Sequence, residues 1–160
     1  MKYTDKLSKD GVVFSDRPDS VPYNYRISYK IAVICLIMAR ACGKRGCSLI
    51  KMHILSGALM DQLICDKVIQ FISGKKDVDF YIRFDPAVNR AIEYARSEEI
   101  VFQQANGLYR LSDLGRQLAD LICKDELLLK KEKEVIDKIS QKMSEEIIQE
   151  ISKKWRTVDA

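Results

Sequence analysis

The sequence lacks the motifs that mark the common classes of enzyme. It has no glycine-rich phosphate loop, no HExxH segment and no GxSxG segment. Its single histidine, His53, stands in an apolar helical pattern, where histidine is more often part of a core than a catalyst. Asp77 and Asp79 do not make a nuclease site by themselves, because such a site needs a third ligand or a basic partner. We therefore predict a protein that is not an enzyme and needs no cofactor.

A complete set of metal ligands is also missing. There are five cysteines and one histidine but no CxxC pair, and Cys42 and Cys47, which flank the segment GKRG, would need two further ligands to hold zinc. We predict no metal site. An odd number of cysteines in a chain without a secretory leader indicates reduced thiols in the cytosol.

No apolar run is long enough to cross a membrane. The longest, residues 31–39, falls far short of the ~20 residues that a membrane-spanning helix needs. We therefore predict a soluble, cytoplasmic protein in which this run is a helix buried on most of its faces. Charge of one sign is not in large excess either, since 27 Lys and Arg against 23 Asp and Glu leave a net charge of +4. No field over the whole chain points to nucleic acid, but a local basic patch stays open.

The 160 residues are enough for one compact domain with tails. Residues 1–24 contain Pro18 and Pro22, which prevent a regular helix and favour extended backbone before them. We predict an extended N-terminal arm, either a loosely held terminus or a strap that orders on a partner. Residues 25–122 carry the patterns of a domain, and residues 123–160 continue as a charged amphipathic helix.

The first half of this domain is predicted to be helical. Asn24 can cap a helix over residues 25–42, and Gly43 offers the left-handed residue on which such helices often end. Ser48 can cap a second helix. A third apolar pattern covers residues 61–73, and whether it continues the second helix or breaks from it is left open.

A strand and another helix follow. Residues 78–84 alternate apolar and polar side chains with a period of two, which predicts a half-buried strand. Asp85 and Pro86 then offer a capping side chain and a preset φ for a helix over residues 86–96, whose apolar positions share one face.

A tight hairpin follows this helix without a linker. The strand IVFQQ leads into Asn106 and Gly107, which tolerate the positive φ of a hairpin turn, and LYRL returns. Ser112 can cap the next helix, and Gly115 permits close packing. The segment GLYRLSDLG fits the pattern Y-x-L-[ST]-x-x-G of many wing-to-helix junctions. We predict a mainly α fold with a small β-hairpin wing: an elaborated winged-helix domain followed by a long C-terminal helix.

The C-terminal helix is predicted to be long because no Gly or Pro after Ile122 interrupts the pattern that begins at Ser112. At about 40 residues it would be about 60 Å long, too long to lie entirely on a small domain. Its apolar positions fall mostly three or four apart and form what we call the tail stripe: Leu128, Ile136, Ile139, Met143, Ile147, Ile151 and Trp155. The tail stripe either folds back on its own domain or binds another chain. We favour a partner, with Trp155 as the anchor.

Several polar and basic side chains are candidates for contacts with double-stranded DNA. A winged helix commonly places its second core helix in the major groove and its wing near the phosphates. The candidates are Asn89, Arg90 and Arg96 on that helix, Arg83, Arg110 and Arg116 around it, and Lys44 and Arg45 in GKRG. Against DNA stand Glu93, Glu98 and Glu99 beside the same face, and the wing tip QQANG has no basic residue. DNA binding and a role in binding proteins both stay open.

One family resemblance is visible in these residues. The pattern IRFDPAVNRAIEYARSEEIV...NGLYRLSDLG, preceded by an apolar helix and followed by a long charged one, resembles the middle component of bacterial three-component ABC ATPase systems, the class that includes Lamassu-type anti-phage defence. The resemblance covers residues 25–122. It implies a small non-catalytic subunit, kleisin-like or winged-helix, that grips an SMC/Rad50-like ATPase and couples DNA sensing to a nuclease-type effector.

Two functions follow as expectations. The first is an accessory subunit of such an ATPase-effector complex in anti-phage or anti-plasmid defence, which docks through the tail stripe. The second is a homodimeric winged-helix transcription regulator, whose tail helices pair and whose Arg90 and Arg96 contact an operator.

Overall fold

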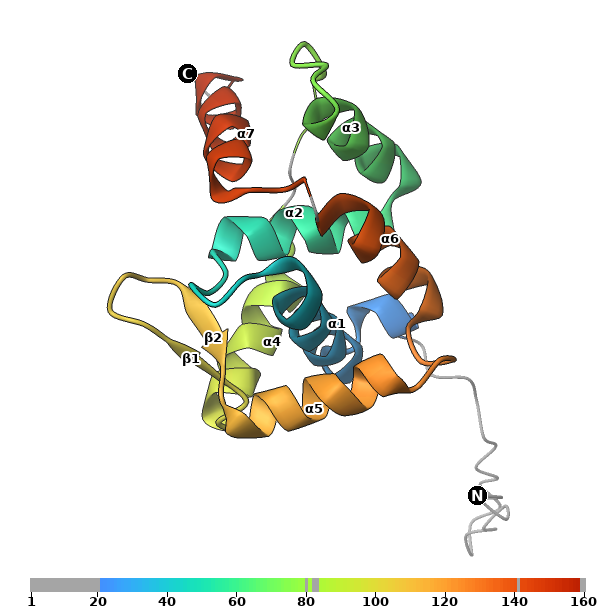
Figure 1. Ribbon diagram of the computed structural model, residues 1–160, viewed down its shortest axis with the longest axis vertical. Coiled ribbons are helices and arrows are strands. Elements are labelled where there is room, and N and C mark those ends of the chain that lie inside the picture. The colour runs from blue at the N-terminus through green and yellow to red at the C-terminus, as the bar shows by residue number, and fades with distance from the viewer. Residues whose placement is uncertain (1–20, 80, 82–83, 141, 159–160) are drawn as a thin grey trace, which may run out of the picture.

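The computed structural model describes residues 21–79, 81, 84–140 and 142–158. In this part of the chain the protein is mainly helical, with a small two-stranded antiparallel sheet (Figure 1), as the sequence predicts. Of the predicted arm, residues 1–20 lie outside the described residues. Its last residues lead into a short 3-10 helix, η1 (Tyr23–Tyr25).

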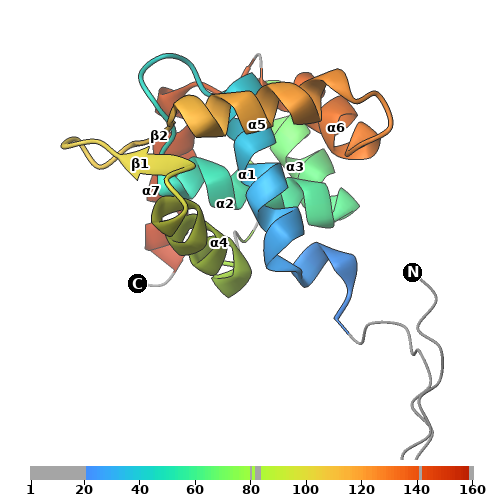
Figure 2. The ribbon, with the colours of Figure 1, turned by 90° about the horizontal axis from the view of Figure 1, so that it is seen from below.

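Helix α1 (Ile27–Ala41) forms the centre of the fold. It packs against α4 (Pro86–Ser97), α5 (Asp113–Lys124) and α6 (Lys130–Ser140). Two views at right angles both show it in the middle of the molecule (Figures 1 and 2). Residues 33–38 are buried, so the prediction of a helix covered on most of its faces is confirmed.

The caps predicted for this first helix are wrong. Asn24 lies within η1, before α1 begins, and its buried Oδ1 has no hydrogen-bond partner among the described residues. Gly43 does not have a positive φ; Gly46 does, at +108°. The backbone after α1 is therefore shaped by contacts with the hairpin, described below, rather than by a glycine at the end of the helix.

Helices α2 (Leu49–Met60) and α3 (Gln62–Ile72) are separate. Ser48 caps α2 as predicted, since its Oγ accepts a hydrogen bond from Lys51 N at 3.2 Å. Asp61 ends α2 and caps α3, because its Oδ1 accepts from Leu63 N at 2.8 Å. Gly74 follows α3 with a φ of +103°. The capping carboxylate thus settles the question that the sequence left open.

The predicted strand over residues 78–84 is not formed in its described residues. Val78, Asp79, Tyr81 and Phe84 belong to no strand, and residues 80, 82 and 83 lie outside the described part of the chain. The alternation of side chains is a local signal, and the described residues of this segment do not pair with either edge of the hairpin; the β2 edge pairs with Cys47 instead. The helix start that follows is confirmed, since Asp85 Oδ1 accepts from Ala87 N at 2.9 Å.

The predicted hairpin is confirmed. Strands β1 (Val101–Gln103) and β2 (Tyr109–Leu111) pair antiparallel, with Val101 opposite Leu111, and Gly107 has a φ of +83°. A third segment adds to this sheet at Cys47, whose N donates to Tyr109 O at 2.8 Å and whose O accepts from Tyr109 N at 2.9 Å. The hairpin is thereby joined to the loop between α1 and α2.

The junction from hairpin to α5 also follows the sequence. Ser112 Oγ accepts from Gly115 N at 3.0 Å and so caps the helix. A Cβ at position 115 would overlap Ile100 O, which confirms that glycine permits close packing here. The buried residues of α5, which include Ala119 and Ile122, face α1.

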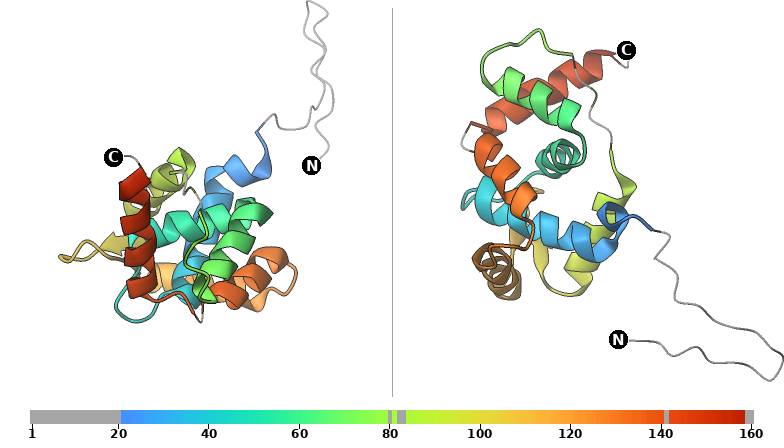
Figure 3. Two further views of the ribbon diagram at one scale, coloured as in Figure 1. Left: turned by 90° about the horizontal axis from the view of Figure 1, so that it is seen from above. Right: turned by 90° about the vertical axis from the view of Figure 1, so that its right-hand side faces the viewer.

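The prediction of a single long C-terminal helix is wrong. The chain forms α5, α6 and α7 (Glu145–Val158) in its place, and α6 and α7 lie beside α2 and α3 (Figure 3). Side chains rather than Gly or Pro break it. Asp125 Oδ1 accepts from Leu127 N at 2.9 Å and Leu128 N at 3.0 Å, and Ser144 Oγ accepts from Ile147 N at 3.3 Å.

The tail stripe is mostly buried within the chain itself, which contradicts the expectation that it is uncovered. Its buried members are Ile136, Ile139, Met143 and Ile151. Ile147 is half-buried and Leu128 is exposed, while the Trp155 side chain lies outside the described part. Polar contacts secure the same fold, such as Arg40 to Asp137 at 2.7 Å. A partner could reach the stripe only if α6 and α7 left the domain.

Candidate nucleic-acid interface

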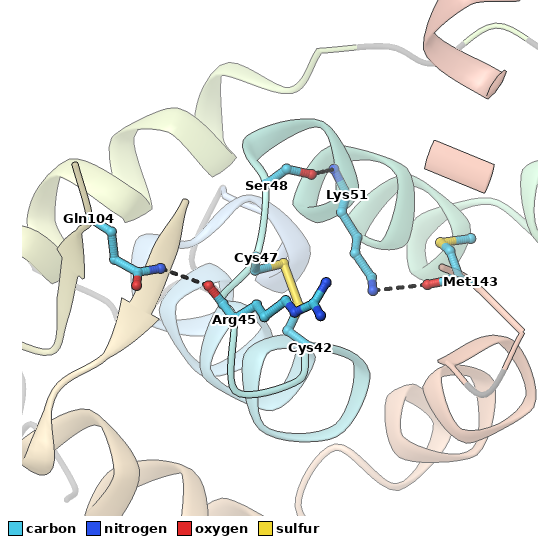
Figure 4. The surroundings of a disulfide bond; sticks show 7 residues. All are labelled: Cys42, Arg45, Cys47, Ser48, Lys51, Gln104 and Met143. Carbon is cyan, nitrogen blue, oxygen red and sulfur yellow. Dashed lines mark hydrogen bonds between the residues drawn. A yellow bond between two sulfur atoms is a disulfide. The ribbon is translucent and has the colours of Figure 1, made fainter. Parts of the chain in front are cut away.

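The GKRG segment forms a loop held beside the hairpin. Gly46 N donates to Gly43 O at 3.2 Å, and Gln104 Nε2 donates to Arg45 O at 2.8 Å (Figure 4). A Cβ on Gly46 would lie 2.6 Å from Gln104 Nε2 and 2.8 Å from Tyr109 O, so only glycine fits there. The loop therefore presents Lys44 and Arg45, both exposed, at a fixed place next to the hairpin.

A disulfide between Cys42 and Cys47 closes this loop, with the two Cα atoms 5.5 Å apart (Figure 4). The prediction that all the cysteines are reduced is therefore wrong for this pair. Cys35, Cys65 and Cys123 are free thiols. Burial raises the pKa of Cys35 to about 11, so this thiol is protonated at neutral pH and serves the core.

Three of the predicted basic residues meet around one pocket of about 330 Å³ between α1, β2 and α5. Lys44 comes from the loop, Arg110 from β2 and Arg116 from α5. Arg116 is held in place, because its guanidinium donates to Leu111 O at 3.1 Å and pairs with Asp113. Asp120 also lines the pocket, which still leaves an excess of positive charge. The tertiary structure thus gathers cations from segments far apart in the sequence.

The candidates on α4 lie apart from this pocket. Asn89, Arg90 and Arg96 are exposed, as are Glu93, Glu98 and Glu99. None of them lines the pocket described above. Asn89 Oδ1 is bonded to the His53 ring at 3.0 Å, so its amide is partly committed within the protein. Arg83 lies outside the described residues.

A buried polar network sets the position of α4. Lys30 of α1 is 1% exposed, and its Nζ lies 2.7 Å from Asp85 Oδ2 and 3.2 Å from Ser56 Oγ. Asp85 N donates to His53 Nδ1 at 3.2 Å, and His53 Nε2 then carries the hydrogen that faces Asn89 Oδ1. The network therefore joins α1, α2 and the start of α4 through hydrogen bonds and one ion pair.

The charges in this network follow from its surroundings. Burial lowers the pKa of His53 below its usual value, so the ring is neutral at pH 7. Burial raises the pKa of Asp85, but the Lys30 ammonium and the Ala87 N–H outweigh it, and the pKa ends below its usual value. His53 is thus a core histidine, in line with its apolar sequence context.

Sequence reasoning missed the buried lysines, among them Lys30 and Lys51. Both stand at apolar positions of helical patterns. Lysine is rarely buried without a partner, so a lysine at such a position is the signal that could have marked them as functional residues. Their partners are far away in the sequence, at Asp85 and Met143. Only the fold reveals which lysine has a counter-charge.

Comparison with known proteins adds no relative: no family, no curated protein and no solved structure matched this chain. Among the described residues, no helix has the length and apolar character to span a membrane.

Proposed function

We propose that this chain is a non-catalytic winged-helix subunit that binds double-stranded DNA and works within an SMC/Rad50-like ATPase-effector complex of anti-phage or anti-plasmid defence. The observation that carries the DNA-binding part is the meeting of Lys44, Arg110 and Arg116 in one pocket beside the wing. Phosphate contacts of this kind supply most of the sequence-independent affinity for DNA.

The order of the elements supports a winged-helix domain. Helix α1 leads through the Cys47 bridge to α2, and α4 leads directly into the hairpin. The segment at Cys47 extends the sheet on the β2 side, as a short strand between the first two helices of a winged helix would. Helix α3 and the connection after it are then an insertion between the second and third core helices.

The basic loop compensates for the neutral wing tip. The tip residues QQANG carry no positive charge, but Gln104 holds Arg45 O and so fixes the GKRG loop beside the wing. Lys44 and Arg45 can therefore reach phosphates from the position that a basic wing would occupy. Pairing of tail helices in a homodimer is not favoured, because most of the tail stripe is buried in the chain's own core.

Membership in an ATPase complex rests on the sequence resemblance. Docking on the ATPase through the tail stripe is not favoured, since Ile136, Ile139 and Met143 pack inside the domain. Co-expression with an SMC/Rad50-like ATPase from the same genome tests the assembly. Recovery of the chain alone, with no ATPase on the affinity resin, would refute membership while leaving the DNA-binding test intact.

The DNA-binding test uses the full chain and a fluorescently labelled duplex in an anisotropy titration. Lys44→Gln combined with Arg110→Gln should weaken binding by about tenfold and lower the salt slope by about 2, because two phosphate contacts are lost. Lys75→Gln combined with Lys131→Gln is the matched control, since it removes the same charge from two exposed positions that do not line the pocket. Equal losses in both variants would refute a specific interface at the pocket.

A further inference from the structure

Three lysines are buried among the described residues, and two of them have an evident electrostatic partner. Lys30 pairs with the Asp85 carboxylate. Lys133 donates to Asp125 O, at the end of α5, where the helix carbonyls leave partial negative charge. Lys51 is the third. Each buried ammonium has lost water, so its partner decides whether the charge is stable.

Lys51 has no such partner. Lys51 is 5% exposed, and its Nζ donates a hydrogen bond to Met143 O at 3.0 Å (Figure 4). Among the described residues no carboxylate lies within ion-pair distance of this ammonium. Met143 also lies next to Ser144, the cap of α7, and therefore at the positive end of that helix. Burial lowers the pKa of Lys51, and only a distant Glu145 opposes this.

The space in front of Lys51 is a pocket of about 500 Å³ with more positive charge around it. Lys44 and Arg45 line it from the loop, and Lys142 lines it from the connection between α6 and α7. Figure 4 shows the Arg45 guanidinium and the Lys51 ammonium on the same side of the loop. Glu145 is the pocket's one carboxylate among the described residues, so four cations face a single negative charge.

We propose that this pocket binds a phosphate group, with the Lys51 ammonium as its innermost contact. A phosphate presents several acceptor oxygens, so it can take hydrogen bonds from Lys51 and from the rim cations at once. It would supply the counter-charge that the described part of the chain does not provide. The hydroxyl groups of Ser140 and Ser144, which also line the pocket, offer further donors.

The phosphate has two chemical sources: the backbone of a nucleic acid or a small free phosphate. Lys44 lines both this pocket and the one beside Arg110. A DNA strand that contacts the wing could therefore place one phosphate here, and that source rests on the proposed function. Binding of a free phosphate does not depend on it.

The direct test is an NMR titration of the full chain with inorganic phosphate at constant ionic strength. The wild type should show saturable shifts of the amides in the GKRG loop and at the start of α7. Lys51→Met keeps the apolar part of the side chain. It should bind phosphate at least about tenfold more weakly than the wild type, because a charge-assisted hydrogen bond is lost. Lys133→Met, which removes another buried ammonium, should bind like the wild type. Absence of saturable shifts in the wild type would overturn the proposal.

Substitutions at exposed residues of the pocket provide a second test if Lys51→Met does not fold. Glu145→Gln removes the competing carboxylate at the rim and should tighten phosphate binding by about twofold to threefold. Lys142→Gln should loosen it by a similar factor. No change in affinity in either variant would also overturn the proposal, since both side chains line the pocket.

The source is found by repeating the anisotropy titration with Lys51→Met. A loss of both phosphate and duplex binding would assign the pocket to a backbone phosphate. A loss of phosphate binding alone would assign it to a small phosphate. The Arg110→Gln single variant separates the two proposals, because Arg110 lines only the pocket beside β2: it should weaken duplex binding and leave inorganic phosphate binding unchanged.

Discussion

Lys30 and Lys51 offer a comparison between two regions of one core. Both ammonium groups are buried, one on α1 and one on α2. Around Lys30 the fold supplies a carboxylate, a hydroxyl and a neutral histidine, so the region is complete within the chain. Around Lys51 it supplies one carbonyl oxygen, three further cations and the Glu145 carboxylate, which lines the pocket outside ion-pair distance. The first region is built for stability, and the second is open to a ligand.

The largest expected effect comes from breaking the complete region. Asp85→Ala leaves the Lys30 ammonium buried without its carboxylate and also removes the cap of α4. We expect a loss of about 3 kcal/mol in the free energy of unfolding, measured by urea titration. Asp61→Ala, which removes a cap at an exposed position with no buried partner, is the control and should lose only about 1 kcal/mol. Equal losses would mean that the ion pair contributes nothing.

The complete region should also respond to mild acid. The pKa of His53 is lowered in the folded protein, so the unfolded chain binds more protons than the folded one as pH falls through about 6.5. Stability should therefore decrease between pH 7 and pH 5, where Nδ1 would have to release its bond from Asp85 N. His53→Gln should remove this part of the pH dependence, because the chain has no other histidine. If the stability of His53→Gln changed with pH in the same way as that of the wild type, His53 would not be the group responsible.

The smallest effect is expected in the open region. Lys51→Met replaces a buried charge, which pairs with no carboxylate among the described residues, by an apolar side chain of similar length. We expect the free energy of unfolding to change by less than about 1 kcal/mol, or to rise, in phosphate-free buffer. Lys30→Met, which strands the Asp85 carboxylate, should be the more harmful of the two. The reverse order would remove the distinction between the regions.

The same lysine gives a test at alkaline pH. The pKa of Lys51 is lowered by burial, so the folded protein releases this proton before the unfolded chain does. Stability should therefore rise with pH up to about 10.4, the ordinary pKa of a lysine. Lys51→Met should lack this rise. Saturating phosphate should reduce it in the wild type, because a bound anion favours the charged ammonium.

Local contacts explain which predictions from the sequence were confirmed. Ser48, Asp85 and Ser112 cap their helices through atoms two or three residues away, and Gly107 supplies the turn of the hairpin. Such contacts form wherever the residues stand in that order. The capping role of Asp61 and of Ser144 uses the same chemistry. No Gly or Pro separates α5, α6 and α7, so the pattern predicts one helix in their place.

The candidate site was predictable only in its parts. Lys44, Arg110 and Arg116 were named from their residue types, but their meeting in one pocket depends on the pairing of Cys47 with Tyr109 and on α5 packing against α1. The apolar pattern around Lys51 indicates a buried position, but it does not show which groups lie opposite the ammonium, so the pocket could not be predicted.

The sequence by itself determined the mainly helical class, the hairpin and the helix starts at Ser48, Asp85 and Ser112, since these follow from side chains and backbone groups close together in the chain. The tertiary structure alone decided that the tail folds onto α2 and α3 and that one buried lysine is paired while another faces a pocket. Burial and charge balance depend on what lies opposite a residue in space, and no spacing along the chain records that.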